Sequence, residues 1–229
     1  RRCYIKLLRL ASNPSLLLED ISSAHPGLLA ELMEEGDCPK LKWACDRARG
    51  LANEGKKTII WSSFVNNVEV ISERLHDLGA VYIHGGVDAG SEDEENSREW
   101  KINEFKTNPN CQVLVANPAA AGEGISLHKV CLNAIYVDRT FNAAHYLQSV
   151  DRIHRLGLEE HESPLIEILV SENSIDQVVW RRLNEKITAM LTALNDHQIL
   201  PNPIDFDNHL QVGEGINEED IEGMLGHLR

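Results

Sequence analysis

The sequence predicts an α/β protein in which a parallel β-sheet carries helices on both faces. Short apolar runs alternate with segments of helical periodicity through the middle of the chain. Strands that alternate with helices are joined by right-handed crossovers into a parallel sheet. A length of 229 residues is enough to bury one full hydrophobic core. Ligands bind such sheets at the carboxyl ends of the strands, and the most unusual segments of this sequence each follow an apolar run.

The N-terminal part predicts two helices separated by an acidic stretch. Residues 1–10 place Ile5 and Leu8 on one helical face, and Asn13-Pro14 ends this lead-in helix. An irregular acidic stretch continues to about Asp37. The second helix opens at Cys38-Pro39 and ends at Gly55, with apolar residues at helical spacing: Leu41, Ala44, Cys45, Ala48 and Leu51.

The remainder predicts strands and helices in alternation. The expected strands are Thr58–Trp61, Val81–Ile83, Val113–Ala116, Ile135–Val137 and Leu165–Val170. The expected helices run from Val65 to Leu75 with Gly79 as cap, over Glu94–Thr107, over Asn142–Arg155, and from the N-cap Ser174 to about Leu194. We expect a connector over 1–37, the α/β domain over 38–195 and an acidic extension over 196–229.

Composition indicates an ordinary α/β protein rather than a membrane or secreted one. No apolar run approaches the roughly 20 residues that span a bilayer, and no basic-then-apolar signal segment is present. The five cysteines are odd in number and form no C-x-x-C pair, so zinc is not expected and a reducing, intracellular compartment (cytoplasm, nucleoid or nucleus) fits best. The start at Arg1 suggests a fragment of a longer protein.

Trp43, Trp100 and Trp180 lie on apolar helical faces and are expected in the core.

The net charge of −14 is unusual for a phosphate-binding protein, because nucleic-acid binders usually carry basic patches. Residues 191–229 contain eight acidic residues and one basic residue, so half of the imbalance lies in this tail. The tail is interpreted as a linker or partly ordered extension that binds a partner protein or masks a groove.

The most informative segment is Gln148-Ser-Val-Asp-Arg-Ile-His-Arg-Leu-Gly157. Arg152 and Arg155 are three positions apart, which puts them on the same side of the predicted helix that ends at Gly157. Guanidinium groups are planar, permanently charged and able to form bidentate bonds to phosphate oxygens. The alternative is an ordinary pair of solvated or ion-paired surface arginines.

This segment resembles motif VI of superfamily 2 helicases, in the form typical of Swi/Snf-type DNA translocases. The resemblance implies a RecA-like fold in which Arg152 and Arg155 are catalytic arginine fingers for ATP held by another domain. It also implies that Gln148 orders the nucleotide or its water and that Asp151 belongs to the ATP-facing set. His154 and Asp151 would fix the arginine side chains or bridge to neighbouring motifs.

A Gly-x-Gly turn at Gly122-Glu123-Gly124 resembles motif V of the same family. There, backbone N–H groups at a helix start meet a nucleic-acid phosphate and sense ATP, with Ser126 as a further backbone contact. A dinucleotide site would need a third glycine and a downstream acid, and a plain strand-to-helix turn is the other alternative. Glu123 stands where the family has an apolar residue, and Ser126 where asparagine is common.

Three further segments that follow predicted strands resemble nucleic-acid contacts of the family. Ser62 and Ser63 lie in a segment similar to motif IV, although either could merely cap the next helix. His84-Gly85 begins a turn similar to a phosphate-contacting turn, with a plain turn as a comparable alternative. Asn117 follows the Val113–Ala116 strand and completes the candidate set.

The resemblance covers about residues 7–190 and implies half of a motor. The sequence contains no G-x-x-x-x-G-K-[ST] phosphate loop and no D-E-x-[HD] box. ATP and Mg²⁺ would therefore be bound mainly by a first RecA-like domain, with double-stranded DNA as the expected track and no activity expected of this chain alone. Two alternatives stay open: half of a superfamily 2 RNA helicase, and a non-catalytic interaction module that retains the fold.

Overall fold

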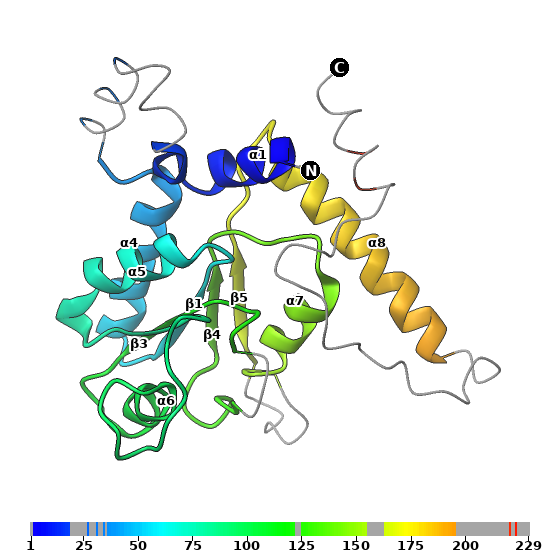
Figure 1. The fold of residues 1–229 in the computed structure, drawn as a ribbon. Helices are drawn as coiled ribbons and strands as arrows, with labels where there is room; N and C mark the ends of the chain where they lie inside the picture. Colours follow the sequence, from blue (N-terminus) through cyan, green and yellow to red (C-terminus); the bar gives the residue numbers. More distant parts are fainter. Residues whose placement is uncertain are drawn as a thin grey trace.

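The computed structural model describes residues 2–18, 27, 31, 34, 36–121, 125–154, 163–195, 220 and 223. Within these residues a five-stranded sheet forms the centre of the molecule (Figure 1). Its strands are β1 (Thr58–Trp61), β2 (Val81–Ile83), β3 (Val113–Ala116), β4 (Asn133–Tyr136) and β5 (Leu165–Ile168). The order is β2-β3-β1-β4-β5 and every pairing is parallel. The predicted all-parallel α/β architecture is confirmed.

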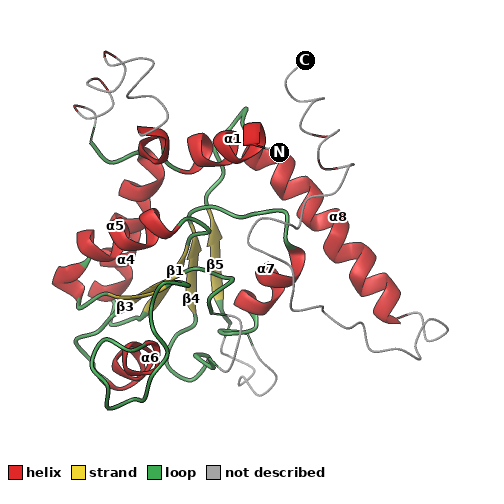
Figure 2. Ribbon diagram, in the orientation of Figure 1, coloured by secondary structure: helices red, strands yellow, loops and turns green. Residues whose placement is uncertain are grey.

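Helices surround this sheet (Figure 2). They are α1 (Arg2–Ser12), the 3-10 turn η1 (Pro14–Leu17), α4 (Pro39–Asn53), α5 (Val65–Arg74), the 3-10 turn η2 (His76–Leu78), α6 (Arg98–Thr107), α7 (Ala143–Val150) and α8 (Ile175–Asn195). Helices α4 and α5 cover one face of the sheet, and α6 and α7 cover the other.

Alternate strand residues are buried against the two helical layers. The side chains that face α4 and α5 include Ile60, Val113, Val115, Ile135 and Val137. Those that face α6 and α7 include Ile59, Trp61, Leu114, Ala116 and Tyr136. Because both faces are covered, the central strands are continuous apolar runs rather than alternating ones. This is why the sequence located β1 and β3 accurately. The predicted bounds of two other strands are wrong: β4 begins at Asn133 and ends at Tyr136 rather than spanning Ile135–Val137, and β5 ends at Ile168 rather than Val170.

A third apolar cluster joins α1 to α8 beyond the carboxyl ends of the strands. Leu8 of α1 packs there with Phe141, which follows β4, and with a stripe of α8 residues: Ile175, Val178, Val179 and Leu183. The lead-in helix is therefore part of the folded domain and covers the edge of the sheet at which ligands of this fold class bind.

The turn after η2 depends on a glycine. Gly79 has φ +62°, and a Cβ atom built on it would lie 2.5 Å from the carbonyl oxygen of Asn110. An alanine would combine a left-handed backbone with a steric overlap. The prediction that Gly79 ends this helical segment is confirmed.

Several predicted helix boundaries are wrong. Helix α6 begins at Arg98 rather than Glu94, because the Ser97 hydroxyl accepts a hydrogen bond from the N–H of Trp100 and caps the helix there. Helix α7 ends at Val150 rather than Arg155, and residues 151–153 form a turn. Arg152 therefore lies beyond the helix, and Arg155 lies outside the described residues.

The prediction that the helical tryptophans are core residues is wrong for two of them. Trp43 is 42% exposed and Trp180 is 49% exposed, while Trp100 is half-buried. Trp43 lies on the side of α4 that carries two charged residues, Lys40 and Arg47. Lys40 is ion-paired with Asp176, and Arg47 is ion-paired with Glu167. The fully buried tryptophan is Trp61 of β1. Within the described residues, no helix combines the length and the hydropathy needed to cross a membrane.

Candidate nucleic-acid and nucleotide site

Strand register brings the predicted contact residues to one edge of the sheet. Trp61 pairs with Ala116, and Ala116 pairs with Ile83, so β1, β3 and β2 end side by side. The residues that follow these strands are Ser62, Asn117 and His84. Parallel strands present their carboxyl ends together, so these three residues share one edge of the sheet.

A buried carboxylate organises this edge. Asp138, two residues after β4, is 4% exposed. Its Oδ2 accepts hydrogen bonds from the hydroxyls of Ser12 (2.7 Å) and Ser62 (2.6 Å), and its Oδ1 accepts one from the N–H of Ser63 (2.7 Å). The Asn67 amide donates to the Ser12 hydroxyl at 2.8 Å. Asp138 therefore ties the end of α1, the loop after β1 and the loop after β4 into one unit, which we call the Asp138 hub.

The hub separates the roles of the two adjacent serines. Ser62 is fully buried and its hydroxyl is used by Asp138, which argues against the predicted phosphate contact from this side chain. Ser63 is partly exposed and contributes only its backbone N–H to the hub. Its hydroxyl is the one from this segment that is positioned to meet a ligand outside the protein.

Asn117 holds two loops together with its side-chain amide. Its Nδ2 donates to the carbonyl of Ser63 at 2.9 Å, and its Oδ1 accepts from the N–H of Ala119 at 2.9 Å. The side chain is 9% exposed. Asn117 therefore shapes the backbone that surrounds the candidate contact residues.

His84 is held by a hydrogen bond at one ring nitrogen: its Nδ1 accepts from the N–H of Gly86 at 3.0 Å. Its Nε2 is buried and lies 3.3 Å from the Glu69 carboxylate without the geometry of a hydrogen bond. The His84 ring stacks on Tyr82, and Lys101 Nζ lies 3.7 Å from the centroid of the Tyr82 ring. Burial lowers the pKa of Lys101. Gly85 and Gly86 remain exposed at the tip of the turn.

The arginine segment is attached to the loop that begins at Ile125, directly after the Gly-x-Gly sequence. Arg152 donates from Nη1 to the carbonyl of Ile125 at 3.0 Å, and its own carbonyl accepts from the N–H of Leu127 at 2.9 Å. Ile125 and Leu127 are buried. The segments that resemble motifs V and VI are thus joined by a side-chain and a backbone hydrogen bond.

Arg152 is half-buried, whereas three residues near it in the described part of the chain are exposed. Gln148, Asp151 and His154 are exposed, whereas Ile153 is buried and anchors the turn. The Ser126 hydroxyl and His128 Nδ1 are hydrogen-bonded at 2.9 Å in the neighbouring loop. Gly122, Gly124 and Arg155 lie outside the described residues.

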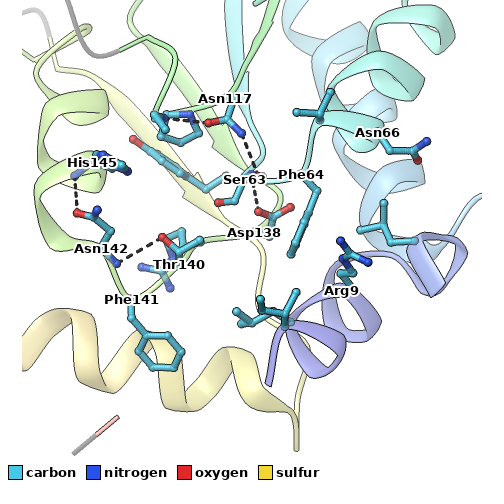
Figure 3. A pocket seen from close by; sticks show the side chains of 18 of the residues that line it. Arg9, Ser63, Phe64, Asn66, Asn117, Asp138, Thr140, Phe141, Asn142 and His145 are labelled. Carbon is cyan, nitrogen blue, oxygen red and sulfur yellow. Dashed lines mark hydrogen bonds between the residues drawn. The ribbon is translucent and has the colours of Figure 1, made fainter. Parts of the chain in front are cut away.

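A cavity of about 740 Å³ opens at the same edge, between α1 and the loops after β1, β3 and β4 (Figure 3). Its walls are largely apolar, with Phe64 and Phe141 on the sides, and Arg9 of α1 reaches its rim. Arg139 lies 5.6 Å from the ring centroid of Tyr146, and burial lowers its pKa. Burial also lowers the pKa of His145 and raises that of Tyr136.

Sequence reasoning missed the organising residues of this edge. Asp138 and Arg139 stand together after an apolar run, and a lone acid after a strand is not a specific pattern. The available signal was position: parallel-sheet ligands bind where the strands end. A buried Asp is also rare unless it is paired or hydrogen-bonded, and Asp138 satisfies this condition with three donors.

The fold is that of solved RecA-like ATPase domains. The chain resembles the crystal structure of the C-terminal part of the Fun30 ATPase domain with a TM-score of 0.58 and 20% identity, over 93% of this chain and 61% of that one. It also resembles the Sulfolobus solfataricus SWI2/SNF2 ATPase core solved in complex with dsDNA, with a TM-score of 0.53 and 20% identity, over 83% and 36%. These likenesses establish the RecA-like fold.

Residues 39–157 match the family described as the helicase conserved C-terminal domain. The chain belongs to this family. The match contains both the Gly-x-Gly turn and the arginine segment, and the predicted kinship with Swi/Snf-type helicases is confirmed.

The similar curated proteins are Swi/Snf-type helicases. The chain is 26% identical over 181 residues to Helicase SWR1 of Eremothecium gossypii, covering 79% of this chain and 12% of that protein. It is 23% identical over 145 residues to the DNA annealing helicase and endonuclease ZRANB3 of Mus musculus, covering 63% and 13%. It is 24% identical over 201 residues to the human DNA excision repair protein ERCC-6-like, covering 86% and 15%. The chain therefore spans less than a sixth of each relative's length.

Proposed function

We propose that this domain is the second motor domain of a DNA-dependent ATPase, which closes over ATP held by a first RecA-like domain and grips the backbone of double-stranded DNA. The observation that carries the proposal is the double attachment of Arg152 to the Ile125–Leu127 loop. It links a residue expected at the ATP to a loop expected at the nucleic acid. Movement of either one would move the other.

The residues of this chain fit ATP only as a second contributor. Arg152 and Arg155 supply the permanent positive charge that a transferring phosphoryl group needs, and guanidinium groups provide it without a change of protonation. The sequence holds neither a phosphate loop nor an acidic Mg²⁺ box. ATP and Mg²⁺ would therefore be held mainly by the first domain, and their hydrolysis supplies the free energy of the cycle.

Arg152 and its neighbours would act on ATP from the side of this domain. Gln148 and Asp151 are exposed at the end of α7, where they are free to face an incoming domain. Arg152 keeps Nη1 on the Ile125 carbonyl, so its role includes positioning the loop as well as supplying charge. Arg155, Gly122 and Gly124 stay in the proposal on the strength of their motifs.

The grip on DNA would rest on neutral groups at the carboxyl edge. Ser63 and Ser126 are half-buried and Gly85 is exposed there, while Ser62, His84 and Asn117 hold the loops in shape. Backbone N–H and hydroxyl groups contact phosphates without reading sequence. Such a grip suits a chain with a net charge of −14, because it does not depend on a basic groove.

The test is ATP turnover by the parent protein with and without duplex DNA, and with duplex RNA. We expect duplex DNA to stimulate turnover, and Arg155→Ala to reduce the stimulated rate by about 10³–10⁵-fold, the range of an arginine finger. Arg152→Ala should reduce it as well. Lys42→Ala, which removes an exposed charge from α4, is the matched control and should leave the rate unchanged.

Two results would overturn the proposal. Stimulation by RNA but not by DNA would assign the domain to an RNA helicase. Full activity of the Arg155→Ala variant would favour a non-catalytic interaction module that keeps the fold.

A further inference from the structure

The cavity at the carboxyl edge has the size and the walls of a small-molecule site. Its volume of about 740 Å³ lies within the range of about 300–1,000 Å³ that is usual for ligand pockets. It lies between α1 and the loops that follow three of the strands (Figure 3). Apolar side chains supply most of its wall, among them Tyr4, Leu8, Leu16, Phe64, Phe141 and Tyr146. Burial against this wall would stabilise the apolar part of a ligand.

The wall also contains two arginines that have no carboxylate partner. Arg139, three residues after β4, and Arg9 of α1 both line the cavity. Within the described part of the chain, neither guanidinium group takes part in an ion pair. Asp176 acts on Arg139 through its charge but is itself ion-paired with Lys40. Each arginine can therefore pair with an anion from outside these residues.

The acidic residue beside Arg139 does not neutralise it. Asp138 is the sole acidic residue among the described residues of the wall, and its two oxygens accept three hydrogen bonds within the hub. Arg139 is half-buried, and burial lowers its pKa because a charge is less well solvated there. An anionic ligand would offset this cost by forming charge-assisted hydrogen bonds with the guanidinium group.

The start of α7 adds a second source of positive potential, three residues after Arg139. The Oδ1 of Asn142 caps the helix by accepting a hydrogen bond from the N–H of His145 at 3.1 Å. The N-terminus of a helix carries a partial positive charge and binds anions. Asn142 and His145 line the side of the cavity opposite Arg9 (Figure 3). Arg139 lies 5.6 Å from the ring centroid of Tyr146 in the same helix, so a guanidinium group, a helix start and an aromatic ring share this side.

We propose that this cavity binds a small aromatic molecule that carries one anionic group, either a carboxylate or a phosphate. The aromatic part would pack between Phe64 and Phe141, and the anionic group would accept hydrogen bonds from Arg139 near the start of α7. The inference does not rest on the proposed function, because its ligand is neither DNA nor the ATP held by another domain. Ser63 also lines the cavity, so a bound molecule would lie beside the segment that we assign to the DNA grip.

The experiment is calorimetric titration of the parent protein with two pairs of probes. 2-Naphthoate is compared with neutral 2-naphthamide, which has nearly the same shape, and 2-naphthyl phosphate is compared with neutral 2-naphthol. We expect an anionic probe to bind about 10–100-fold more tightly than its neutral partner, the range of a hydrogen bond to a charged group. The pair with the larger ratio identifies the anionic group.

Three variants locate the binding. Arg139→Gln should lower the affinity for the anionic probes by about 10–100-fold and leave that for 2-naphthamide unchanged. Arg49→Gln is the matched control, because it removes an arginine of α4 that does not line the cavity, and it should change neither affinity. Ala119→Trp alters no charge, and Ala119 is an exposed residue of the wall. The added indole would occupy part of the cavity and should weaken the binding of all four probes.

Three results would overturn the inference. Equal affinities of the anionic and neutral probes for the wild-type protein would show that the arginines do not bind the ligand, and this comparison needs no variant. No binding at millimolar probe concentration would show that another part of the parent protein fills the cavity. Binding that survives both Arg139→Gln and Ala119→Trp would place the probes elsewhere.

Duplex DNA separates this inference from the proposed function. Displacement of the probes by DNA, together with an equal loss of DNA affinity in Arg139→Gln, would overturn the small molecule and assign the cavity to nucleic acid. A parent protein that binds the probes as expected but whose ATP turnover ignores DNA would refute the proposed function alone.

Discussion

The Asp138 hub and the arginine turn lie along the same edge of the sheet but differ in how they use their polar groups. The hub is buried, and its carboxylate, hydroxyls and amides bond to one another. Around the arginine turn, Gln148, Asp151 and His154 are exposed. A polar group that is satisfied inside the protein contributes to stability, whereas one that is exposed on a turn is available to a ligand. We therefore expect substitutions in the hub to affect folding first and substitutions in the turn to affect turnover first.

The largest effect on stability should come from Asp138→Ala. The substitution leaves two hydroxyls and one backbone N–H without an acceptor in a buried site. We expect the free energy of unfolding to fall by about 3–5 kcal/mol, since each lost charge-assisted bond and each stranded donor adds to the cost. Urea denaturation measures this directly. A loss below about 1 kcal/mol would show that the hub relaxes around the missing side chain. It would contradict the expectation that substitutions in the hub affect folding first.

The serine pair sharpens the same contrast within two adjacent residues. Ser62→Ala removes a buried donor to Asp138 and should cost about 1–2 kcal/mol of unfolding free energy, with little effect on DNA binding by the folded protein. Ser63→Ala leaves the backbone N–H bond to Asp138 intact, so stability should be unchanged while DNA affinity falls. Urea denaturation measures the unfolding free energy of both variants, and DNA titration measures their DNA affinity. Equal effects of the two substitutions on DNA affinity would contradict the assignment.

The tryptophans extend the comparison to the helices. Trp43→Ala and Trp180→Ala should each cost less than about 1 kcal/mol, because about half of each side chain already contacts water. Trp61→Ala is the buried control, for which about 3–5 kcal/mol is expected. A cost above about 2 kcal/mol at either exposed position would indicate a contact with the rest of the parent protein, detectable by repeating the denaturation on the isolated domain.

Strands were predictable from the sequence because their environment is uniform. The central runs Thr58–Trp61 and Val113–Ala116 are buried on both faces, so composition alone marks their ends. The end of α7 was not predictable in the same way. It is set by Arg152, whose side chain and carbonyl bond to a loop that is distant in the sequence, and periodicity contains no information about such a partner.

The candidate site also contains residues that the sequence could identify and residues that only the folded structure identifies. The motifs located Ser63, His84 and Arg152 because residue types recur at fixed offsets, and register then brings the strand ends together. The role of Asp138 depends on donors from two segments that are distant in the sequence, Ser12 of the lead-in helix and the Ser62-Ser63 loop. Only the folded arrangement shows that Ser62 faces inward.

The smallest expected effect concerns His145 on the cavity wall. Burial lowers its pKa, so the folded protein binds its proton less readily than the unfolded chain, in which histidine titrates near about 6.5. The stability contributed by neutral His145 is therefore complete above this value and is lost as the pH falls through the folded pKa. Unfolding free energies of the wild type and His145→Gln, measured between pH 7.5 and 5, should differ less at the acidic end. The control is His76→Gln on the exposed η2 turn, which removes a histidine without touching the cavity. A difference between wild type and His145→Gln that stays constant with pH would mean that the cavity wall solvates the imidazolium as well as water does, and the edge would then be as open around His145 as it is around Gln148.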